Sequence, residues 1–368
     1  MSVGGVNGPD RYLYIVSAAL FMLILLSPIA DFITTFSRYY GIAAGARFTT
    51  IFRLAILLVL IMMCMKDTTQ KTPYLWWFLC FGILTHLVSI IVNSGDDVVI
   101  YLEGILSLVK YHLFFLFLGA FAFSIRLGVS YASILKVFYI LIGINTCAII
   151  AGAILNIEMF HYYSSERYGV KGIILAGNEV AGFLVAALGI LLVNRRSRIN
   201  IILLFAVSLS MIFCGTKAAF LGMIMIFTGY FMSVGGIKGS LRLLALSILV
   251  ILIAGLIYQS NFSVQDAVAG SFAYFEYQLE HFANGSIITL LLSGRDQKLD
   301  VVFFDIINTN VMYLFVGGYP ISEYMTEMDI FDYIAMNGIF GAICYFYYWM
   351  RSWSGLPSGH IRKFTYCF

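Results

Sequence analysis

The chain has 368 residues, of which 61% are hydrophobic and 11% are charged, and its mean hydropathy is +0.93. A soluble domain has about 25% charged residues, so this composition excludes a soluble globular fold, and it equally excludes a disordered chain. The net charge of +3 is small and the basic residues form no single patch, so we expect no nucleic-acid partner. No cysteine or histidine spacing matches a metal site, so we expect no metal and no cofactor.

Apolar segments long enough to cross a membrane recur along the whole chain. About 20 mostly apolar residues span the hydrocarbon core, and the backbone polar groups of such a segment must be satisfied within a helix. The sequence therefore predicts an all-α, polytopic integral membrane protein with about ten transmembrane helices and a large extracytoplasmic loop. The predicted helices are 12–30, 48–65, 74–92, 104–123, 131–155, 173–193, 201–213, 218–232, 241–258 and 333–350.

The charges of the connecting loops predict the orientation. Alternate loops carry most lysines and arginines, including the run at 195–198, together with Asp10 and Asp67 as their acids. Because Lys and Arg in short loops favour the cytoplasm, we expect this set to be cytoplasmic and both termini to lie inside. The other carboxylates then face outward.

Two predicted outward loops, 156–172 and 259–332, are long enough to suggest function. The expected organisation is membrane helices in 1–258, a large periplasmic loop in 259–332, a last membrane helix in 333–350 and a cytoplasmic tail in 351–368. Within the large loop, 299–316 is apolar but carries Asp305, Asn308 and Asn310, which predicts an amphipathic helix at the membrane interface. The alternative is an eleventh spanning helix, which would place the C-terminus outside.

Three predicted outward cations, Arg167, Lys217 and Arg295, each lie close to a glycine. Lys217 is expected at a helix N-terminus, where a cation is unfavourable unless an anion is bound. Together the three predict a site for a ligand that bears phosphate. Taken singly, each has a simpler interpretation: Lys217 extends to lipid headgroups, Arg167 pairs with Glu166, and Arg295 pairs with Asp296 or a lipid phosphate.

The stretch 323–332 places four carboxylates just before a membrane helix. A carboxylate at a partly desolvated interface can act as a general base, and Glu323 and Asp329 are the candidates. The alternative is a solvated acidic collar. Lys110, inside a predicted membrane helix, is a secondary candidate that could equally pair with Glu103 or Asp97.

Four short motifs, in order, resemble those of the bacterial O-antigen and capsular polysaccharide polymerases, a group that also contains the O-antigen ligases. The resemblance covers roughly 167–346. The motifs are Arg167-Tyr168-Gly169 leading to Gly177-Asn178-Glu179, then Gly215-Thr216-Lys217-Ala218, then Ser293-Gly294-Arg295, and Gly317-Gly318 to Asp329 followed by Asn337-Gly338-Ile339-Phe340-Gly341.

This resemblance implies a metal-independent glycosyltransferase at the periplasmic face of the bacterial inner membrane. Such an enzyme polymerises undecaprenyl-diphosphate-linked oligosaccharide repeat units, and Arg167, Asn178, Lys217 and Arg295 would bind that substrate. Glu323 or Asp329 would activate the acceptor hydroxyl. The implied partners are membrane lipid and a chain-length regulator and flippase of the same pathway.

The family commonly has about a dozen spanning helices, and the composition changes after Met350, so we expect one or two terminal helices to be missing. The nearest alternative function is an O-antigen ligase, which typically has a histidine in the large loop. No histidine lies between Arg295 and Asp332, which favours a polymerase. A polysaccharide flippase or transporter would place charges near the bilayer midplane, where only Lys110 is expected. A nonenzymatic assembly scaffold is a further alternative.

Overall fold

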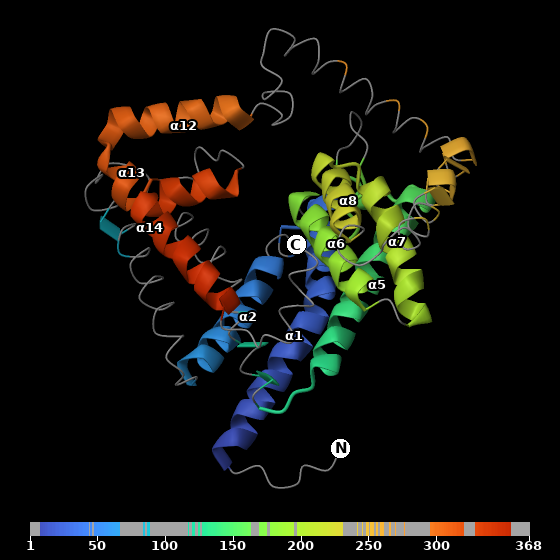
Figure 1. The fold of residues 1–368 in the computed structure, drawn as a ribbon, viewed down its shortest axis with the longest axis horizontal. Coiled ribbons are helices and arrows are strands. Elements are labelled where there is room, and N and C mark those ends of the chain that lie inside the picture. The colour runs from blue at the N-terminus through green and yellow to red at the C-terminus, as the bar shows by residue number, and fades with distance from the viewer. Residues whose placement is uncertain are drawn as a thin grey trace. The chain divides into compact units, whose positions relative to one another are not determined.

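The computed structural model describes residues 8–43, 45, 48–66, 127–162, 169–174, 177–194, 197–230, 295–319 and 328–354, together with scattered positions in 84–125 and 241–276. This described part is helical, as Figure 1 shows, and the all-α prediction is confirmed for it. Its contacts divide the chain into two compact units. Unit 1 comprises Met1–Ser17, Leu57–Gly128 and Gln278–Leu356, and unit 2 comprises Ala18–Ile56, Val129–Tyr277 and Pro357–Phe368.

Three stretches of helix among the described residues are long and apolar enough to cross a membrane: Tyr14–Tyr39, Tyr131–Leu155 and Ile330–Tyr347. Four shorter apolar helices, Phe48–Met63, Glu179–Val193, Arg198–Cys214 and Lys217–Tyr230, coincide with further predicted segments. Most of 74–92 and of 104–123, and part of 241–258, lie outside the described residues. Membrane association is thus supported, while the total of ten spans stays a prediction.

The first helix, α1 (Gly8–Tyr39), continues nine residues past the predicted end at residue 30. The hydropathy pattern ends at Asp31 because polar residues follow. These polar side chains have partners, however: the Thr35 hydroxyl donates to the Ile173 carbonyl (3.0 Å), and Thr34 accepts from the Thr49 backbone N–H (2.9 Å). Since satisfied polar groups do not oppose burial, the helix can extend.

Pro28 lies inside α1 and removes one backbone donor from the helix. The carbonyl left without its usual partner is that of Ile24, four residues earlier. The Ser27 hydroxyl donates to this carbonyl at 2.8 Å. A neighbouring side chain therefore satisfies the group that the proline frees, as apolar surroundings require.

Unit 2 is built around α6 (Gly177–Val193), which packs against α7 (Arg198–Cys214) and α8 (Lys217–Tyr230). Leu184, Leu188 and Leu191 recur at four- and three-residue spacing on one face of α6, and their side chains are fully buried. The fourth helix of the bundle, α5 (Tyr131–Leu155), packs against α7 and has the predicted bounds. The second helix of the chain, α2 (Phe48–Lys66), begins in unit 2 and ends in unit 1.

Unit 1 contains α12 (Arg295–Asn310), α13 (Met312–Val316) and α14 (Asp329–Ser354). The stretch predicted to form an interfacial helix is thus helical, with a break at Val311; its position at a membrane interface stays a prediction. Val302 and Ile306 of α12 are buried against Tyr313, Ala335 and Met336.

Two glycine-containing segments meet where α14 is interrupted. Gly338 has φ 69° and ψ 174°, which no helix adopts, and α14 is kinked there. The kink leaves two carbonyls for the segment after α13: the Gly318 N–H donates to Met336 O (2.7 Å) and the Tyr319 N–H donates to Ala335 O (3.3 Å). The structure thus brings Gly317-Gly318 and Asn337-Gly338, the two halves of the fourth sequence motif, into backbone contact.

Replacing Gly338 with alanine is expected to destabilise the protein by at least about 2 kcal/mol. A Cβ atom at Gly338 would lie 2.1 Å from the Phe315 carbonyl oxygen, and the positive φ disfavours any side chain. Thermal unfolding of the detergent-purified protein measures this loss. Gly182→Ala in α6 is the matched control, because a Cβ there meets nothing within 4 Å. Equal unfolding temperatures for the two variants would show that the kink is not constrained.

Candidate functional site at the polar end of unit 2

Six helix ends gather at one end of unit 2, which we call the polar end. Helices α1, α5 and α7 finish there, and α2, α6 and α8 begin there. Hydrogen bonds connect them: the Thr49 N–H donates to Thr34, and the hydroxyl of Tyr39 donates to the Glu158 carboxylate. Ends of apolar helices carry unsatisfied backbone groups, so this is where polar side chains and ligands find partners.

A loop between α5 and α6 folds down along α5. It begins with Asn156 in the left-handed conformation and a short 3-10 helix, η1 (Glu158–Phe160). An isolated bridge between His161 and Val170 closes it. Three backbone hydrogen bonds hold its described residues: the Tyr162 N–H donates to Gly169 O (2.9 Å), the Lys171 N–H to Phe160 O (2.8 Å) and the Val170 N–H to Phe213 O (3.0 Å).

The loop reaches the middle of α5. A Cβ added to Gly172 would lie 2.9 Å from Ile149 and 3.1 Å from the Asn145 side-chain oxygen, so only glycine allows this approach. Gly172 also has φ +66°. Non-helical backbone at such a depth is tolerated only where protein buries it or where it lines a polar cavity. Because this non-helical turn at Gly172 precedes α6, the helix starts at Gly177 rather than at the predicted residue 173.

The descending loop carries Lys171 into unit 2. Its side chain is half-buried, and burial lowers the pKa of the Lys171 ammonium; the positive charge of Arg38, on the last turn of α1, lowers it further. Among the described residues, the charged side chain that acts on Lys171 is a second cation, which is unfavourable for a partly desolvated ammonium. The arrangement therefore favours binding of an anion between Lys171 and Arg38.

His161 follows η1 in the same loop and is partly buried. Burial lowers the pKa of its imidazole, and the Gly152 carbonyl and the Glu158 carboxylate partly oppose this shift. The ring nitrogen Nε2 lies 3.4 Å from Gly152 O. With a lowered pKa, His161 is mainly neutral at pH 7, so it adds little to the positive charge of the polar end.

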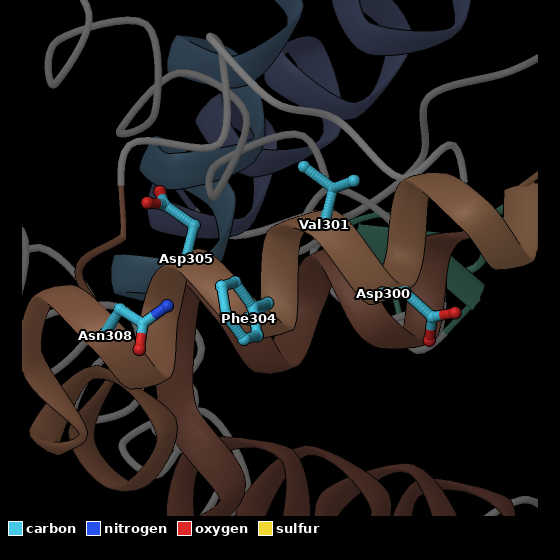
Figure 2. Close-up of a pocket in the computed structure, with 5 residues that line it drawn as sticks. All are labelled: Asp300, Val301, Phe304, Asp305 and Asn308. Carbon is cyan, nitrogen blue, oxygen red and sulfur yellow. The ribbon is translucent and has the colours of Figure 1, made fainter.

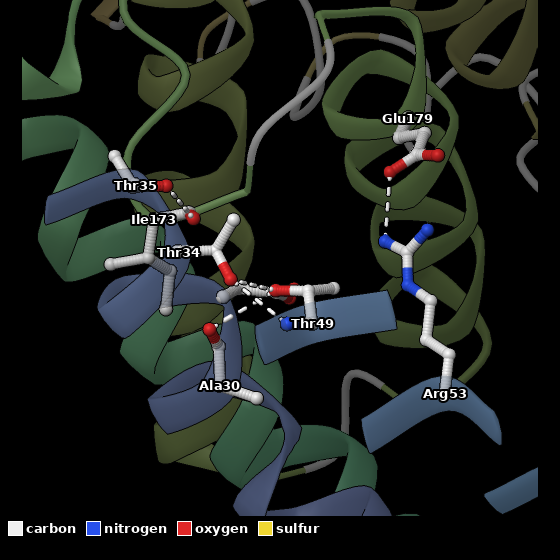
Figure 3. Close-up of polar contacts among 8 residues, drawn as sticks. Ala30, Thr34, Thr35, Thr49, Arg53, Ile173 and Glu179 are labelled. Atoms are coloured by element: carbon white, nitrogen blue, oxygen red, sulfur yellow. Dashed lines mark hydrogen bonds and ion pairs between the residues drawn. The ribbon is translucent and has the colours of Figure 1, made fainter. Parts of the chain in front are cut away.

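A second charged group lies where α2 and α6 face each other, as Figure 3 shows. The guanidinium of Arg53 pairs with the Glu179 carboxylate at 3.1 Å. The Thr49 hydroxyl lies 3.1 Å from the Asp31 carboxylate and 3.0 Å from the Ala30 carbonyl. The Arg53–Glu179 ion pair is partly exposed, so its contribution to the free energy of unfolding is below about 1 kcal/mol. Its main effect is on position, because it joins the first turn of α6 to α2.

The turn between α7 and α8 has the predicted form. Gly215 is in the left-handed conformation (φ 63°) and ends α7. The Thr216 hydroxyl accepts a hydrogen bond from the Ala219 N–H (3.2 Å), which caps α8. Lys217 is therefore the first residue of α8, as the sequence predicts, and its side chain is partly buried.

Tyr162 joins this turn to the start of α6. Its hydroxyl lies 3.3 Å from Gly177 O and 3.4 Å from the Cys214 sulfur. A Cβ at Gly169 would come within 2.5 Å of the Tyr162 ring and 2.9 Å of Cys214 O. The glycines of the first motif thus let one aromatic side chain hold the N-termini of α6 and α8 close to the loop.

The predicted site residues divide between the two units. Lys217 and Asn178, the second residue of α6, belong to unit 2. Arg295, the first residue of α12, and Asp329, the first residue of α14, belong to unit 1. Arg167, Glu323 and Lys110 lie outside the described residues, as do the possible partners of Lys110. Convergence of all these residues on one ligand therefore stays a prediction.

Sequence reasoning missed Lys171, in the loop before α6, and three further residues of the polar end: Asp31, Arg38 and Arg53. All three stand in or beside the first two apolar segments, on the side predicted to face outward. Ionisable residues in such positions are expensive unless they are paired or functional, and basic residues there also oppose the orientation rule. That contradiction was the available signal.

Among the described residues, no three His, Cys, Asp or Glu side chains lie close enough together to hold a metal ion. No family model, curated protein or solved structure matches the chain.

Substituting Arg38 with alanine is expected to raise the pKa of Lys171, because it removes a neighbouring positive charge. In the intact protein, Lys171 should reach half-maximal acetylation at a pH below about 10.4, the ordinary lysine value, and Arg38→Ala should move that midpoint upward. Acetic anhydride labelling across a pH series, read by mass spectrometry, measures both midpoints. Arg198→Ala, at the opposite end of α7, should leave the midpoint in place. An unchanged midpoint in Arg38→Ala would show that the charge of Arg38 does not act on Lys171.

Proposed function

We propose that the protein is a metal-independent glycosyltransferase that polymerises undecaprenyl-diphosphate-linked oligosaccharide repeat units into O-antigen or capsular polysaccharide. The observation that carries the proposal is the half-buried Lys171 beside Arg38, in the loop that packs against the middle of α5. This arrangement offers an anion two cations in a partly desolvated position next to an apolar bundle. A diphosphate attached to a long apolar tail has matching chemistry.

The reaction places its main electrostatic demand on the leaving group. The acceptor hydroxyl oxygen attacks the anomeric carbon of the donor, the bond from that carbon to the diphosphate oxygen breaks, and undecaprenyl diphosphate leaves. Cations that stabilise the developing negative charge lower the barrier, and this effect is strongest in a dry site. In this proposal Arg38, Lys171, Lys217 and Arg167 hold the diphosphate with Asn178, and Arg295 joins them from the large loop.

The acceptor hydroxyl must lose a proton as it attacks. Glu323 or Asp329 takes that proton in this proposal, as the family resemblance implies. Asp329 opens α14, whose first turn is followed by the buried Asp332. Basic side chains supply the positive charge that a metal would otherwise provide.

The proposed location is the bacterial inner membrane, with several spans, both termini in the cytoplasm and the polar end facing the periplasm. The apolar bundle would hold the polyprenyl tail. A flippase that delivers the lipid-linked units and a chain-length regulator are the proposed partners.

Deleting the gene in the native host should collapse the ladder of polysaccharide chain lengths to single repeat units. Arg295→Ala at normal protein level should give the same collapse, because an anchor for the diphosphate is lost. Gel electrophoresis of the extracted glycan shows the ladder. An unchanged ladder would refute the polymerase. Loss of all surface glycan, single units included, would instead indicate a ligase or a flippase.

Lys171→Met tests the loop cation that the structure adds to the site. Methionine is of similar length and tolerates half-burial, so the protein should fold while the rate of polymerisation falls by about a hundredfold. Lys136→Met, an exposed lysine near the other end of α5, is the matched control and should keep the normal ladder. Chain-length distributions and protein levels of the two strains are compared side by side. A normal ladder in Lys171→Met would remove Lys171 from the site.

A further inference from the structure

The middle of α5 carries two polar side chains that unit 2 buries. Asn145 is 3% exposed and Thr146 is 1% exposed, and both lie in a helix that is long and apolar enough to cross a membrane. Within the described part of the chain, neither the oxygen nor the nitrogen of the Asn145 amide has a hydrogen-bond partner, and neither does the Thr146 hydroxyl. Burial of such groups without a partner is unfavourable, so this position indicates a partner from outside the protein.

Polar side chains on an open surface do not require such a partner. The cavity of about 520 Å³ along α12 in unit 1 is an example, shown in Figure 2. Its lining comes from a single helix and is exposed throughout: Asp300, Val301, Phe304, Asp305 and Asn308. Water reaches these groups from the surface. Asn145, in contrast, is enclosed, so its partner has to be held within the bundle.

The Asn145 side chain lies against the turn at Gly172. A Cβ atom at Gly172 would be 3.1 Å from the Asn145 side-chain oxygen and 3.3 Å from the Asn145 backbone carbonyl oxygen. Non-helical backbone in an apolar bundle is tolerated where protein buries it or where it lines a polar cavity. Two separate features, an amide without a partner and a non-helical turn, therefore coincide at one position.

The turn is held on both sides. The Lys171 N–H donates to Phe160 O at 2.8 Å, and the Ile173 carbonyl accepts from the Thr35 hydroxyl at 3.0 Å. The turn cannot move toward the Asn145 amide without breaking one of these hydrogen bonds. A further group is therefore needed to satisfy the amide.

We infer that a water molecule is bound between Asn145 and the Gly172 turn. An asparagine amide presents a donor and an acceptor side by side, whichever way it is turned, and one water molecule can serve both. A cation would face the amide N–H groups and the positive charge of the neighbouring Lys171. An anion would face the amide oxygen. The Thr146 hydroxyl, on the next residue, offers a further donor and acceptor.

This site extends the hydration of the polar end into the bundle. The bound water joins the middle of α5 to the loop directly beside Lys171, so it helps to keep the loop at this depth. A water-mediated contact is nearly as favourable as a direct hydrogen bond. The site is argued from Asn145 and the turn, and it does not depend on the proposed function.

X-ray hydroxyl-radical labelling of the full chain in nanodiscs tests the site, because radicals formed from bound water oxidise the side chains next to it. Ile149 is fully buried, and its side chain would lie 2.9 Å from a Cβ at Gly172. It should be oxidised at least about tenfold faster than Leu188 of α6, which is equally buried. Mass spectrometry of peptides measures both rates. Equal rates in the unaltered chain would overturn the inference.

Asn145→Leu keeps the size of the side chain and removes its hydrogen-bonding groups. Oxidation of Ile149 should fall to the rate of Leu188, and the unfolding temperature should not fall, because amide and water are removed together. Asn200→Leu is the matched control: Asn200 is also buried, but its amide nitrogen donates to Asn194 O at 2.6 Å. That variant should lower the unfolding temperature and retain the oxidation of Ile149. Undiminished oxidation of Ile149 in Asn145→Leu would overturn the inference.

Exchange of the buffer cations distinguishes water from a bound metal ion. Replacement of sodium and potassium by choline should change neither the oxidation of Ile149 nor the unfolding temperature. A lower unfolding temperature in choline that disappears in Asn145→Leu would identify a cation at this position and overturn the inference. The comparison of Ile149 with Leu188 needs no variant, so it decides the question even if Asn145→Leu does not fold.

Discussion

The non-helical segments of this protein depend on one constraint, which is that every backbone polar group outside a helix must find a partner in apolar surroundings. The loop along α5 satisfies this through hydrogen bonds to Phe160 O and Phe213 O. The segment after α13 satisfies it through carbonyls that the kink of α14 releases. In both places glycine permits the approach, because a Cβ at Gly169, Gly172 or Gly338 would collide with a neighbour. These glycines of the motifs therefore allow close packing of backbone segments, whatever else they do.

That constraint also determines where charge can be placed. Once the loop descends along α5, Lys171 has to follow it and loses much of its hydration. A lysine in an open loop would gain little from a bound phosphate, because water screens the attraction. In a half-buried position beside Arg38 the same phosphate relieves the cost of two neighbouring positive charges. Folding of the loop thus turns an ordinary basic residue into the strongest candidate for an anion contact.

Local sequence pattern was sufficient to predict the bounds of α5 and the turn between α7 and α8. The bounds of α5 follow from hydropathy, and Lys217 begins α8 because Gly215 and Thr216 provide the end of one helix and the cap of the next. The same reasoning ended α1 too early, because its polar last turns are stabilised by Thr49 and by the loop carbonyl of Ile173. Hydropathy describes the preference of a single residue for water or an apolar environment. It does not include a hydrogen-bond partner elsewhere in the chain.

By itself, the sequence determined the helical class, the apolar segments and the small set of glycine and basic motifs from which the function is predicted. Tertiary structure alone decided which of those residues meet. Arg53 and Glu179 are 126 positions apart, Gly317 packs on the backbone of Asn337, and Lys171 becomes half-buried only because Gly172 fits against the middle of α5. The reason is physical: composition and periodicity report the preferences of single residues, whereas ion pairs, close backbone approach and desolvation arise only between segments that folding brings together.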